Sequence, residues 1–363
     1  MNIGCVKEIK VNESRVGLTP KSAKVYIEHG HQVFIEKDAG LASGFSNEDY
    51  LNAGCMIYSD PKDIWKDSDM IIKVKEPIKK EYPYFKENLI IYTYLHLAAD
   101  EELTKALVER KVTAIAYETI QDETGLPCLR PMSEVAGKLS IQEGARYLTK
   151  HGELGILLSG TQTVDAANVL IIGGGVSGTA ALSLAYNLGA KTTLLDINEN
   201  RLIELKEKYP KLNTLISNEE NLVNGLKDAD LVISAVLLPG AKAPKIIRKE
   251  HYQFIKKGAV LVDIAIDQGG SLHYSRPTTH KDPIFIEEGI IHYCVANMPG
   301  IVPKTSTLAL NHQTLPFGLK IADNLKEALA NEAILKGLNT YQGYVTLKVV
   351  ADLFNLPYKK YEK

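Results

Sequence analysis

The stretch that decides the fold is Asn168–Arg201, NVLIIGGGVSGTAALSLAYNLGAKTTLLDINENR. Its apolar run Val169–Ile172 has the length and β-branched content of a buried strand. The run breaks at consecutive glycines, a helical pattern follows, and a second apolar run ends in Asp196. This order of strand, glycine turn, helix and strand predicts a parallel βαβ unit with a dinucleotide-binding loop.

The glycines, spaced Gly173-x-Gly175-x-x-Gly178, fit that loop for three different reasons. The first allows a tight turn, the second lets the backbone approach a pyrophosphate, and the third lets helix and strand pack closely. An ordinary glycine turn would not account for Asp196, which can accept hydrogen bonds from the adenosine ribose and favours NAD over NADP. Arg201 weakens the inference of NAD preference, because an arginine can serve either cofactor.

Further strands are expected around this unit, near 192–196, 231–235 and 259–264. The second of them leads into SAVLLPGAK, Ser234–Lys242, which either passes close to the nucleotide or is an ordinary Pro-Gly turn. The third opens VDIAIDQGGS, Val262–Ser271, where a core strand gives way to an acid, an amide and two glycines. Surface turns often carry such residues, so this pattern alone leaves Asp267 unassigned.

The chain before this region also alternates short β-rich runs with amphipathic helical stretches, which predicts a second, mostly parallel sheet. Helices are expected to start at Thr19-Pro20 and Asp60-Pro61, each a capping residue followed by proline. Met132–Lys150 is expected to form one long helix, and a helical tract from Thr305 is expected to kink or break at Pro316. With 363 residues, the prediction is two α/β domains.

Composition excludes several classes of protein. Lys plus Arg number 42 and Asp plus Glu 44, a formal net charge of -2 that offers no cationic field for nucleic acid or an anionic membrane. The four cysteines form no CxxC or Cys/His cluster, so we expect buried thiols and no metal site. The uncharged segment 166–190 could span a bilayer but is broken by glycines, and charges near the N-terminus do not fit a signal peptide. The expectation is a soluble, cytoplasmic protein.

Three residues of the first domain are candidates for binding a small anionic substrate: Arg15, Lys75 and His96. Each follows a predicted element, and each alone has an ordinary explanation, since surface cations are common and a strand-end histidine is often a structural hydrogen-bonder. Together they could clamp a carboxylate through a guanidinium, add a point charge and move a proton near neutral pH. His280, in RPTTHKDP, stays open as an alternative.

Over essentially its whole length the sequence resembles the alanine dehydrogenase/pyridine nucleotide transhydrogenase family. The resemblance rests on many motifs in one order: KEIKVNESRVGLTP, KVKEP, TYLHLAAD, PMSEVAGK, IIGGGVSG, AVLLPGAKAP, DIAIDQGG, RPTTHKDP and HYCVANMPGIVPKTST. It implies an NAD-dependent enzyme that interconverts L-alanine with pyruvate and ammonia. It also implies that Arg15 and Lys75 hold the substrate carboxylate and that His96 and Asp267 handle protons.

The resemblance further implies a set of cofactor contacts: Ser133, Gly173, Gly175, Val176, Ser177, Gly178, Asp196, Arg201, Ser217, Val236, Leu237, Ile264, Asp267, Asn297 and Met298. The implied fold is two Rossmann-like doubly wound domains with mostly parallel sheets, linked by long helices. Residues 1–128 with 305–363 form the substrate domain and 129–304 the NAD domain. A cytoplasmic homo-hexamer acting in L-alanine catabolism is implied as well.

The sequence departs from the family pattern at two places. Val6 stands where the family usually has proline, and SGTQTVD replaces a Gly-Val-Pro-Gly loop before the first strand of the NAD domain. Both affect loop geometry and neither touches a proposed catalytic residue. The rival interpretations are a soluble transhydrogenase-like subunit, which would need no substrate-activating His96, and a nucleotide-sensing protein without catalysis.

Overall fold

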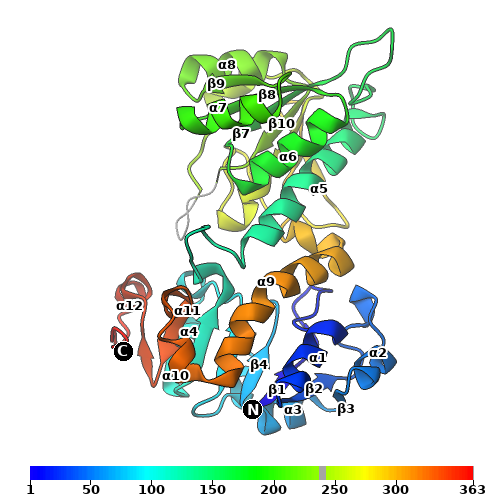
Figure 1. Cartoon of the computed structure of the whole chain (residues 1–363). Coiled ribbons are helices and arrows are strands. Elements are labelled where there is room, and N and C mark those ends of the chain that lie inside the picture. The colour runs from blue at the N-terminus through cyan, green and yellow to red at the C-terminus, as the bar shows by residue number, and fades with distance from the viewer. Residues whose placement is uncertain (237–242, 363) are drawn as a thin grey trace. The chain divides into compact units, whose positions relative to one another are not determined.

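The chain folds into two compact units, described here from a computed structural model that covers residues 1–236 and 243–362 (Figure 1). Unit 1 comprises Met1–Met132 and Gly300–Lys363, and unit 2 comprises Ser133–Pro299. Each unit is built on one mostly parallel sheet with helices on both faces, which confirms the predicted α/β fold class. No helix within the described residues is long and apolar enough to cross a membrane.

The sheet of unit 1 has the strand order β15-β14-β6-β5-β4-β1-β2-β3. The strands are β1 (Asn2–Cys5), β2 (Gln32–Glu36), β3 (Met56–Tyr58), β4 (Met70–Ile72), β5 (Ile90–Thr93), β6 (Thr113–Ala116), β14 (Leu338–Tyr341) and β15 (Tyr344–Val345). The antiparallel pairs of this sheet are β14 with β6 and β14 with β15, and the other neighbouring strands pair in parallel. The strand order reverses between β1 and β4, and such switch points are where doubly wound sheets bind ligands.

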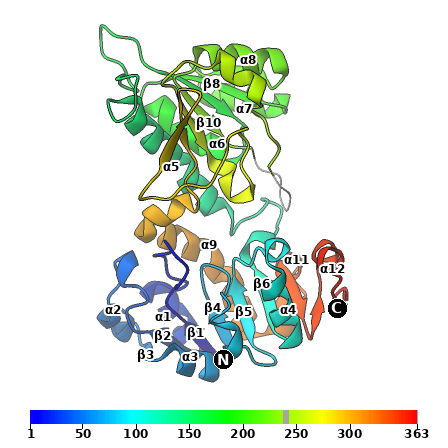
Figure 2. The ribbon, with the colours of Figure 1, turned by 180° about the vertical axis from the view of Figure 1, so that it is seen from behind.

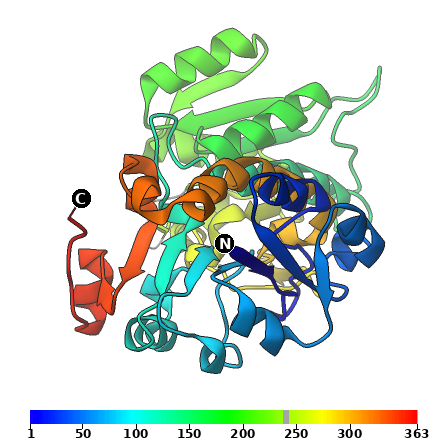
Figure 3. The same ribbon diagram turned by 60° about the horizontal axis from the view of Figure 1, so that its bottom comes forward.

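Helices cover both faces of this sheet. On one face α1 (Pro20–Glu28) and α9 (Pro303–Asp323) lie side by side, blue and orange in Figure 3. The other face packs on α3 (Pro61–Asp67), α4 (Glu101–Glu109) and α12 (Lys348–Phe354), whose apolar side chains share one core with the strands. The shorter helices are α2 (Asn47–Asn52), α10 (Leu325–Ala328) and α11 (Glu332–Gly337).

The predicted helix starts are confirmed. Thr19 and Asp60 are the N-caps of α1 and α3, and their side chains accept the backbone N–H groups of Ser22 and Lys62. A kink or a break is expected at Pro316, and the break is wrong, since α9 runs through this residue. Packing explains the continuity: the buried side of α9 fits so closely that a methyl group on Gly318 would meet the Tyr26 hydroxyl and the Tyr92 ring. Such tertiary contacts offset the roughly 3 kcal/mol that an interior proline costs.

The sheet of unit 2 has the order β12-β13-β11-β10-β7-β8-β9. The strands are β7 (Asn168–Ile172), β8 (Lys191–Asp196), β9 (Asn213–Ile216), β10 (Leu231–Ser234), β11 (Val260–Asp263), β12 (Ile284–Glu287) and β13 (Ile290–Tyr293). Only β12 is antiparallel to its neighbour. The order reverses between β7 and β10, so the glycine loop after β7 lies at the switch point.

Close backbone packing places the helices of unit 2. The helix α5 (Arg130–Leu148) lies against α6 (Val176–Asn187), where a Cβ on Gly137 would come 2.1 Å from the Ser177 carbonyl oxygen. The helices α7 (Glu199–Lys208) and α8 (Glu219–Asp228) follow β8 and β9. Leu222 and Leu226 of α8 share a core with Tyr252 and the strands.

Candidate functional site

The glycine loop of unit 2 has two glycines that the chain itself requires and one that faces open space. Gly173 has φ 99°, in the left-handed region. A Cβ on Gly178 would come 1.8 Å from the Gly173 carbonyl oxygen, whereas a Cβ on Gly175 would meet no atom within 4 Å. The first and third glycines therefore serve packing, and the second leaves a cradle that a side chain would fill.

The same loop opens α6 without a side-chain cap. Gly175 is the N-cap residue and makes no side-chain hydrogen bond, so the first-turn amides of Val176, Ser177 and Gly178 are left for another acceptor. Helix N-terminal amides beside an open glycine suit a pyrophosphate. These residues therefore fit the NAD that the resemblance implies.

Asp196 and Arg201 hold the loop from both sides of one peptide group. Asp196 Oδ2 accepts the Gly174 N–H at 2.6 Å, and Arg201 Nε donates to the Gly174 carbonyl oxygen at 2.9 Å. The remaining guanidinium nitrogens donate to Thr179 Oγ1 at 2.8 Å and Glu204 Oε2 at 2.6 Å. These hydrogen bonds give Arg201 a role in shaping the loop. From the sequence alone, Arg201 could serve either NAD or NADP.

The other predicted nucleotide contacts occupy strand ends or helix starts of unit 2. Val236 follows β10 and lies 3.4 Å from the position of a Cβ on Gly173, and the Ser217 N–H donates to the Asp196 carbonyl oxygen at 2.9 Å. Ser133 is half-buried in α5, and Met298 is buried in a short 3-10 helix, Met298–Ile301. Leu237 lies outside the described residues.

Asp267 is presented by a tight structure after β11. The strand ends at Asp263, one residue earlier than predicted, and a 3-10 helix, Ile264–Gln268, follows. Asp263 is fully buried and accepts hydrogen bonds from the backbone of Ala265 and Ser271 at 3.0 and 2.8 Å. The adjacent Gly269 and Gly270 have positive φ, 91° and 71°. Asp263 thereby fixes the turn on which Asp267 stands exposed.

The carboxylate of Asp267 accepts a backbone N–H group from a second segment, at Asn297. The N–H of Asn297 lies 3.2 and 3.3 Å from its two carboxylate oxygens, and Asn297 has a left-handed φ of 54°. His280 Nε2 contacts the Asn297 carbonyl oxygen at 3.4 Å. The alternative histidine of the sequence therefore borders this segment.

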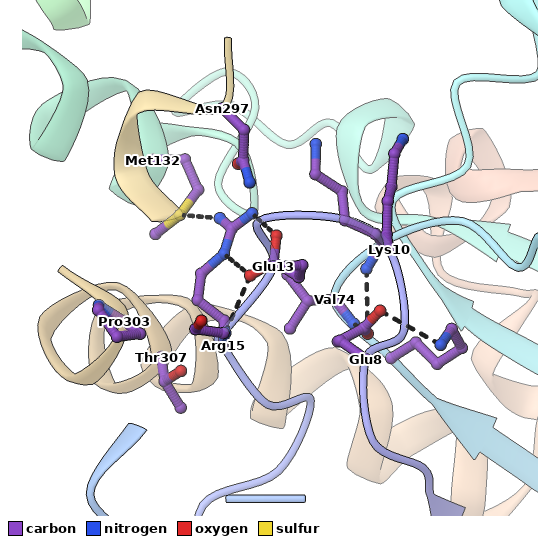
Figure 4. Close-up of polar contacts among 12 residues, drawn as sticks. Glu8, Lys10, Glu13, Arg15, Val74, Met132, Asn297, Pro303 and Thr307 are labelled. Atoms are coloured by element: carbon purple, nitrogen blue, oxygen red, sulfur yellow. Dashed lines mark hydrogen bonds and ion pairs between the residues drawn. The ribbon is translucent and has the colours of Figure 1, made fainter. Parts of the chain in front are cut away.

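In unit 1 Arg15 forms a buried ion pair with Glu13. Its Nε and Nη2 donate to Glu13 Oε1 and Oε2 at 2.7 and 2.6 Å, and Nη1 lies 2.9 Å from Met132 Sδ (Figure 4). The two side chains are 2% and 0% exposed. Burial acts to lower the pKa of Arg15, but the hydrogen bonds and charge of Glu13 outweigh burial and raise it.

A second buried cluster supports the turn that bears Lys75. Lys73 Nζ lies 3.2 Å from Glu8 Oε2 and 3.0 Å from Glu81 Oε1. The other oxygen of Glu8 accepts the N–H group of Val74 at 2.6 Å (Figure 4). It also accepts the N–H group of Lys75 at 3.2 Å. Burial raises the pKa of Glu8, and Lys73 partly opposes that rise. Glu8 thus links a buried cation to the backbone of Lys75.

His96 stands directly beyond β5 in an unusual backbone conformation, with φ 50° and ψ 38°. Its N–H donates to Glu118 Oε1 at 2.7 Å, and its Nδ1 lies 3.4 Å from Glu76 Oε2. Its ring stacks on Tyr94 with centroids 6.0 Å apart. The imidazole is 46% exposed, so it is accessible for proton transfer.

Topology brings the three predicted substrate residues of unit 1 to one sheet edge. Arg15, Lys75 and His96 follow β1, β4 and β5, which are neighbours in the sheet (Figure 2). The sequence-based prediction named these three residues but missed the carboxylates that contact two of them, namely Glu13 at Arg15 and both Glu76 and Glu118 at His96. A signal existed for Glu13 alone, because it lies two residues before Arg15.

Family models match nearly the whole chain. The alanine dehydrogenase/PNT N-terminal domain matches residues 4–136, and the alanine dehydrogenase/PNT C-terminal domain matches residues 140–348. The chain belongs to the alanine dehydrogenase/PNT family. The resemblance drawn from the sequence motifs is therefore confirmed.

Relatives of this family extend over the full chain. It is 52% identical to "Alanine dehydrogenase" of Staphylococcus haemolyticus (strain JCSC1435), covering 100% of this chain and 98% of that one. It is 50% identical to "Alanine dehydrogenase 2" of Staphylococcus aureus (strain USA300), covering 100% and 99%.

Solved structures share the fold. A structure titled L-alanine dehydrogenase superposes with a TM-score of 0.94 at 43% identity, covering 98% of this chain and 99% of that one. A transhydrogenase from Sinorhizobium meliloti superposes with a TM-score of 0.83 at 22% identity, covering 95% and 100%. The second likeness shows the shared fold alone.

Proposed function

We propose that this chain catalyses the reversible, NAD-dependent oxidative deamination of L-alanine to pyruvate and ammonia. The observation that carries the proposal is 52% identity, over the whole chain, to a protein named alanine dehydrogenase. The chemistry of the two units supports it: unit 2 has an open glycine cradle at a helix N-terminus, and unit 1 gathers cations and a histidine at one sheet edge. Unit 1 is accordingly the proposed substrate domain and unit 2 the proposed NAD domain.

In this proposal Arg15 and Lys75 bind the substrate carboxylate. Glu13 occupies the Nε and Nη2 positions of Arg15, and Nη1 faces the sulfur of Met132, a weak acceptor. A carboxylate oxygen is a far better partner for Nη1 than a thioether. Glu8 fixes the backbone of Lys75, so the ammonium reaches the substrate from a defined turn.

His96 and Asp267 handle protons in the proposed reaction. NAD held at the glycine loop of unit 2 would supply the acceptor for the hydride that leaves the α-carbon of alanine. Water then adds to the resulting iminium acid while His96 takes a proton from that water. Return of this proton to the nitrogen and loss of the hydroxyl proton allow the C–N bond to break, which gives pyruvate and ammonia. Asp267 stabilises the nitrogen that leaves as ammonium. The reverse path reduces the imino acid formed from pyruvate and ammonia.

The remaining cofactor contacts of the proposal are the residues of unit 2 that the family resemblance implies, in the glycine loop and at the neighbouring strand ends and helix starts. Asp196 selects NAD because its charge repels a 2′-phosphate. From the family resemblance we also propose a cytoplasmic homo-hexamer acting in L-alanine catabolism. Sedimentation of the purified chain tests the assembly, with six copies of 40.0 kDa expected.

The deciding experiment offers purified protein NAD with L-alanine, D-alanine, serine or glycine and records absorbance of NADH. We expect turnover with L-alanine and none with D-alanine, and consumption of NADH with pyruvate plus ammonia. Hydride exchange between two nucleotides, with no amino acid required, would instead support a transhydrogenase-like role. Binding of NAD without turnover of either kind would support a nucleotide-sensing protein.

A further inference from the structure

His96 has one acidic neighbour at its ring and another at its backbone. Glu76 follows β4 and Glu118 follows β6, the two strands that flank β5. Glu76 Oε2 lies 3.4 Å from Nδ1 of the imidazole, and Glu118 accepts the His96 backbone N–H. Each carboxylate therefore constrains a different part of the same residue.

The backbone of His96 needs such a constraint. A φ of 50° is uncommon for a residue with a side chain, and such conformations cluster at functional sites. Glu118 stabilises it twice, because its carboxylate accepts both the His96 N–H at 2.7 Å and the Leu95 N–H at 3.1 and 3.3 Å. Stacking on Tyr94 sets the ring plane. Neither contact decides which ring nitrogen carries the proton.

The position of the proton on the His96 ring depends on Glu76. Its side chain is 13% exposed, and Oε1 pairs with Lys10. Its Oε2 is buried and has no hydrogen-bond partner of good geometry among the described residues, while His96 Nδ1 lies 3.4 Å away. A buried carboxylate oxygen without a donor is unfavourable, so a proton on Nδ1 is the arrangement that satisfies it.

We infer that Glu76 is the positioning residue of His96, keeping the proton on Nδ1 so that Nε2 exchanges a proton with the water or imino acid. The inference deepens the proposed function and rests on it for the role of His96. A neutral imidazole has one donor and one acceptor nitrogen, and only the unprotonated nitrogen can act as a base.

The charges around the pair keep Glu76 ionised. Burial acts to raise the pKa of Glu76, but the nearby His96 and Lys10 outweigh burial and lower that pKa to about 2. Glu118 faces the backbone of His96, and Tyr94 lies under its ring. At neutral pH the Nδ1 side of the imidazole therefore meets a carboxylate that only accepts hydrogen bonds.

The test replaces the Glu76 carboxylate, a hydrogen-bond acceptor, with an amide that can donate. The amide of Glu76→Gln can donate to Nδ1, which favours the opposite tautomer, with the proton on Nε2. Nitrogen-15 NMR of histidine-labelled protein reads the tautomer, and the His96→Ala spectrum identifies the resonance among the nine histidines. We expect Nδ1–H in the wild type and Nε2–H in Glu76→Gln. Lys10→Gln is the matched control, because it removes the other partner of Glu76 and should leave Nδ1–H in place.

Kinetics provide the second measurement. The kcat of Glu76→Gln should fall about 10- to 100-fold, part of the roughly 10²- to 10⁴-fold that general acid–base catalysis contributes, with little change in the KM for alanine. Glu76→Asp keeps the charge and should recover part of the loss. An unchanged tautomer or an unchanged kcat in folded Glu76→Gln would overturn the inference.

Failure of the proposed function looks different. The tautomer is read in the absence of substrate, so a wild type that does not oxidise alanine but shows the expected tautomers would retain the pairing of Glu76 with His96 and refute only the reaction. Conversely, an active wild type with a tautomer insensitive to Glu76→Gln would refute the positioning role alone.

Discussion

The two units place different chemistry at the same position of the same fold. In each unit the first strand of the sheet lies at the switch point and is connected to the helix that follows it, β1 to α1 and β7 to α6. In unit 2 that connection, 173–175, consists of glycine alone. In unit 1 the connection, 6–19, contains the buried charged residues Glu8, Glu13 and Arg15. One fold thus offers a ligand either its backbone or its side chains.

The difference follows from the size and charge of the ligand that each unit is proposed to bind. A pyrophosphate is large and can be met by several backbone N–H groups, which requires that side chains be absent. A small carboxylate is met by a guanidinium, and a buried guanidinium needs a counter-charge to be stable. Glycines satisfy the first requirement and the pair Glu13–Arg15 the second.

The largest expected effect separates the two units by function. His96→Ala removes the proposed proton-transfer group of unit 1 and should lower kcat by roughly 10²- to 10⁴-fold. The affinity for NAD should not change, since that site belongs to unit 2. Steady-state kinetics with calorimetric titration of NAD measure both, and near-normal turnover would refute the assignment of His96.

Gly175→Val should give the reciprocal result. The space around this residue accommodates a side chain, so the protein should fold, but the valine would occupy the place of the pyrophosphate and NAD binding should be lost. Gly178→Val is the informative contrast, because its Cβ would clash with the Gly173 carbonyl oxygen and should destabilise unit 2 itself. Normal NAD affinity in folded Gly175→Val would mean that the loop is purely structural.

The second effect tests how much the buried pair Glu13–Arg15 contributes to the stability of unit 1. Glu13→Gln leaves the buried Arg15 without its counter-charge, and breaking a buried pair in this way costs about 3–5 kcal/mol of unfolding free energy. The matched control is Glu250→Gln, which disrupts an ion pair of similar length with Arg248 on the surface of unit 2, at 2.5 Å. Urea unfolding should show a large loss for the first variant and little change for the second. Equal stabilities would show that Glu13 does not stabilise unit 1.

The third effect is a pH dependence of unit 2. Burial, opposed by a contact with the Ile290 carbonyl oxygen and aided by Arg276, lowers the pKa of His292 to about 4. A lowered folded-state pKa means that stability is complete above about 6.5 and is lost as the pH falls toward 4, by up to roughly 3 kcal/mol.

His292→Phe tests this pH dependence with the packing retained. The ring stacks on Phe285 with centroids 4.8 Å apart, so phenylalanine can fill the site without titrating. At pH 7 the variant should be less stable, because Tyr252 loses the ring nitrogen 3.0 Å from its hydroxyl. The gap in unfolding free energy should narrow as the pH falls below 6.5, and a gap independent of pH would contradict the prediction.

The units also differ in how much of each site the sequence could reveal. The glycine loop was predictable because its parts are local: Gly173, Gly175 and Gly178 lie in one short motif between a strand and a helix. The positions of Arg15, Lys75 and His96 at the ends of predicted elements also indicated one site for a small anion. The contacts that orient them were not predictable, because Glu76 and Glu118 reach His96 from separate strands.

Backbone and tertiary effects explain the other differences from the sequence-based prediction. Nothing in the letters TYLHLAAD shows that His96 takes a left-handed conformation. The short strands β9 and β12 were not predicted because their residues are largely half-exposed or exposed, so they lack the pattern of a buried apolar run. The buried strand β13 was not predicted either. The helix through Pro316 persists because its neighbours pack against it, which no local propensity encodes.

The smallest expected effect concerns cofactor choice, and it again contrasts the two ways in which the units use a carboxylate and a guanidinium. In unit 1 the two groups bind each other directly, whereas in unit 2 Asp196 and Arg201 bind opposite sides of the Gly174 peptide. Asp196→Ala should remove both a ribose acceptor and the repulsion of a 2′-phosphate. We expect the preference for NAD over NADP in kcat/KM to narrow by about tenfold, which corresponds to about 1.4 kcal/mol.

Two further variants separate charge from loop shape in that result. Asp196→Asn keeps an oxygen for the Gly174 N–H but loses the charge, so it should narrow the preference nearly as much as Asp196→Ala. Arg201→Gln should weaken both cofactors alike and leave their ratio unchanged, because its three donating nitrogens serve Gly174, Thr179 and Glu204. If Arg201→Gln instead abolished use of NADP selectively, the arginine would be a phosphate contact and not a support of the loop. A wild type that used NADP as efficiently as NAD would show that the charge of Asp196 does not select the cofactor, and the carboxylate would then serve only to hold the glycine loop in place.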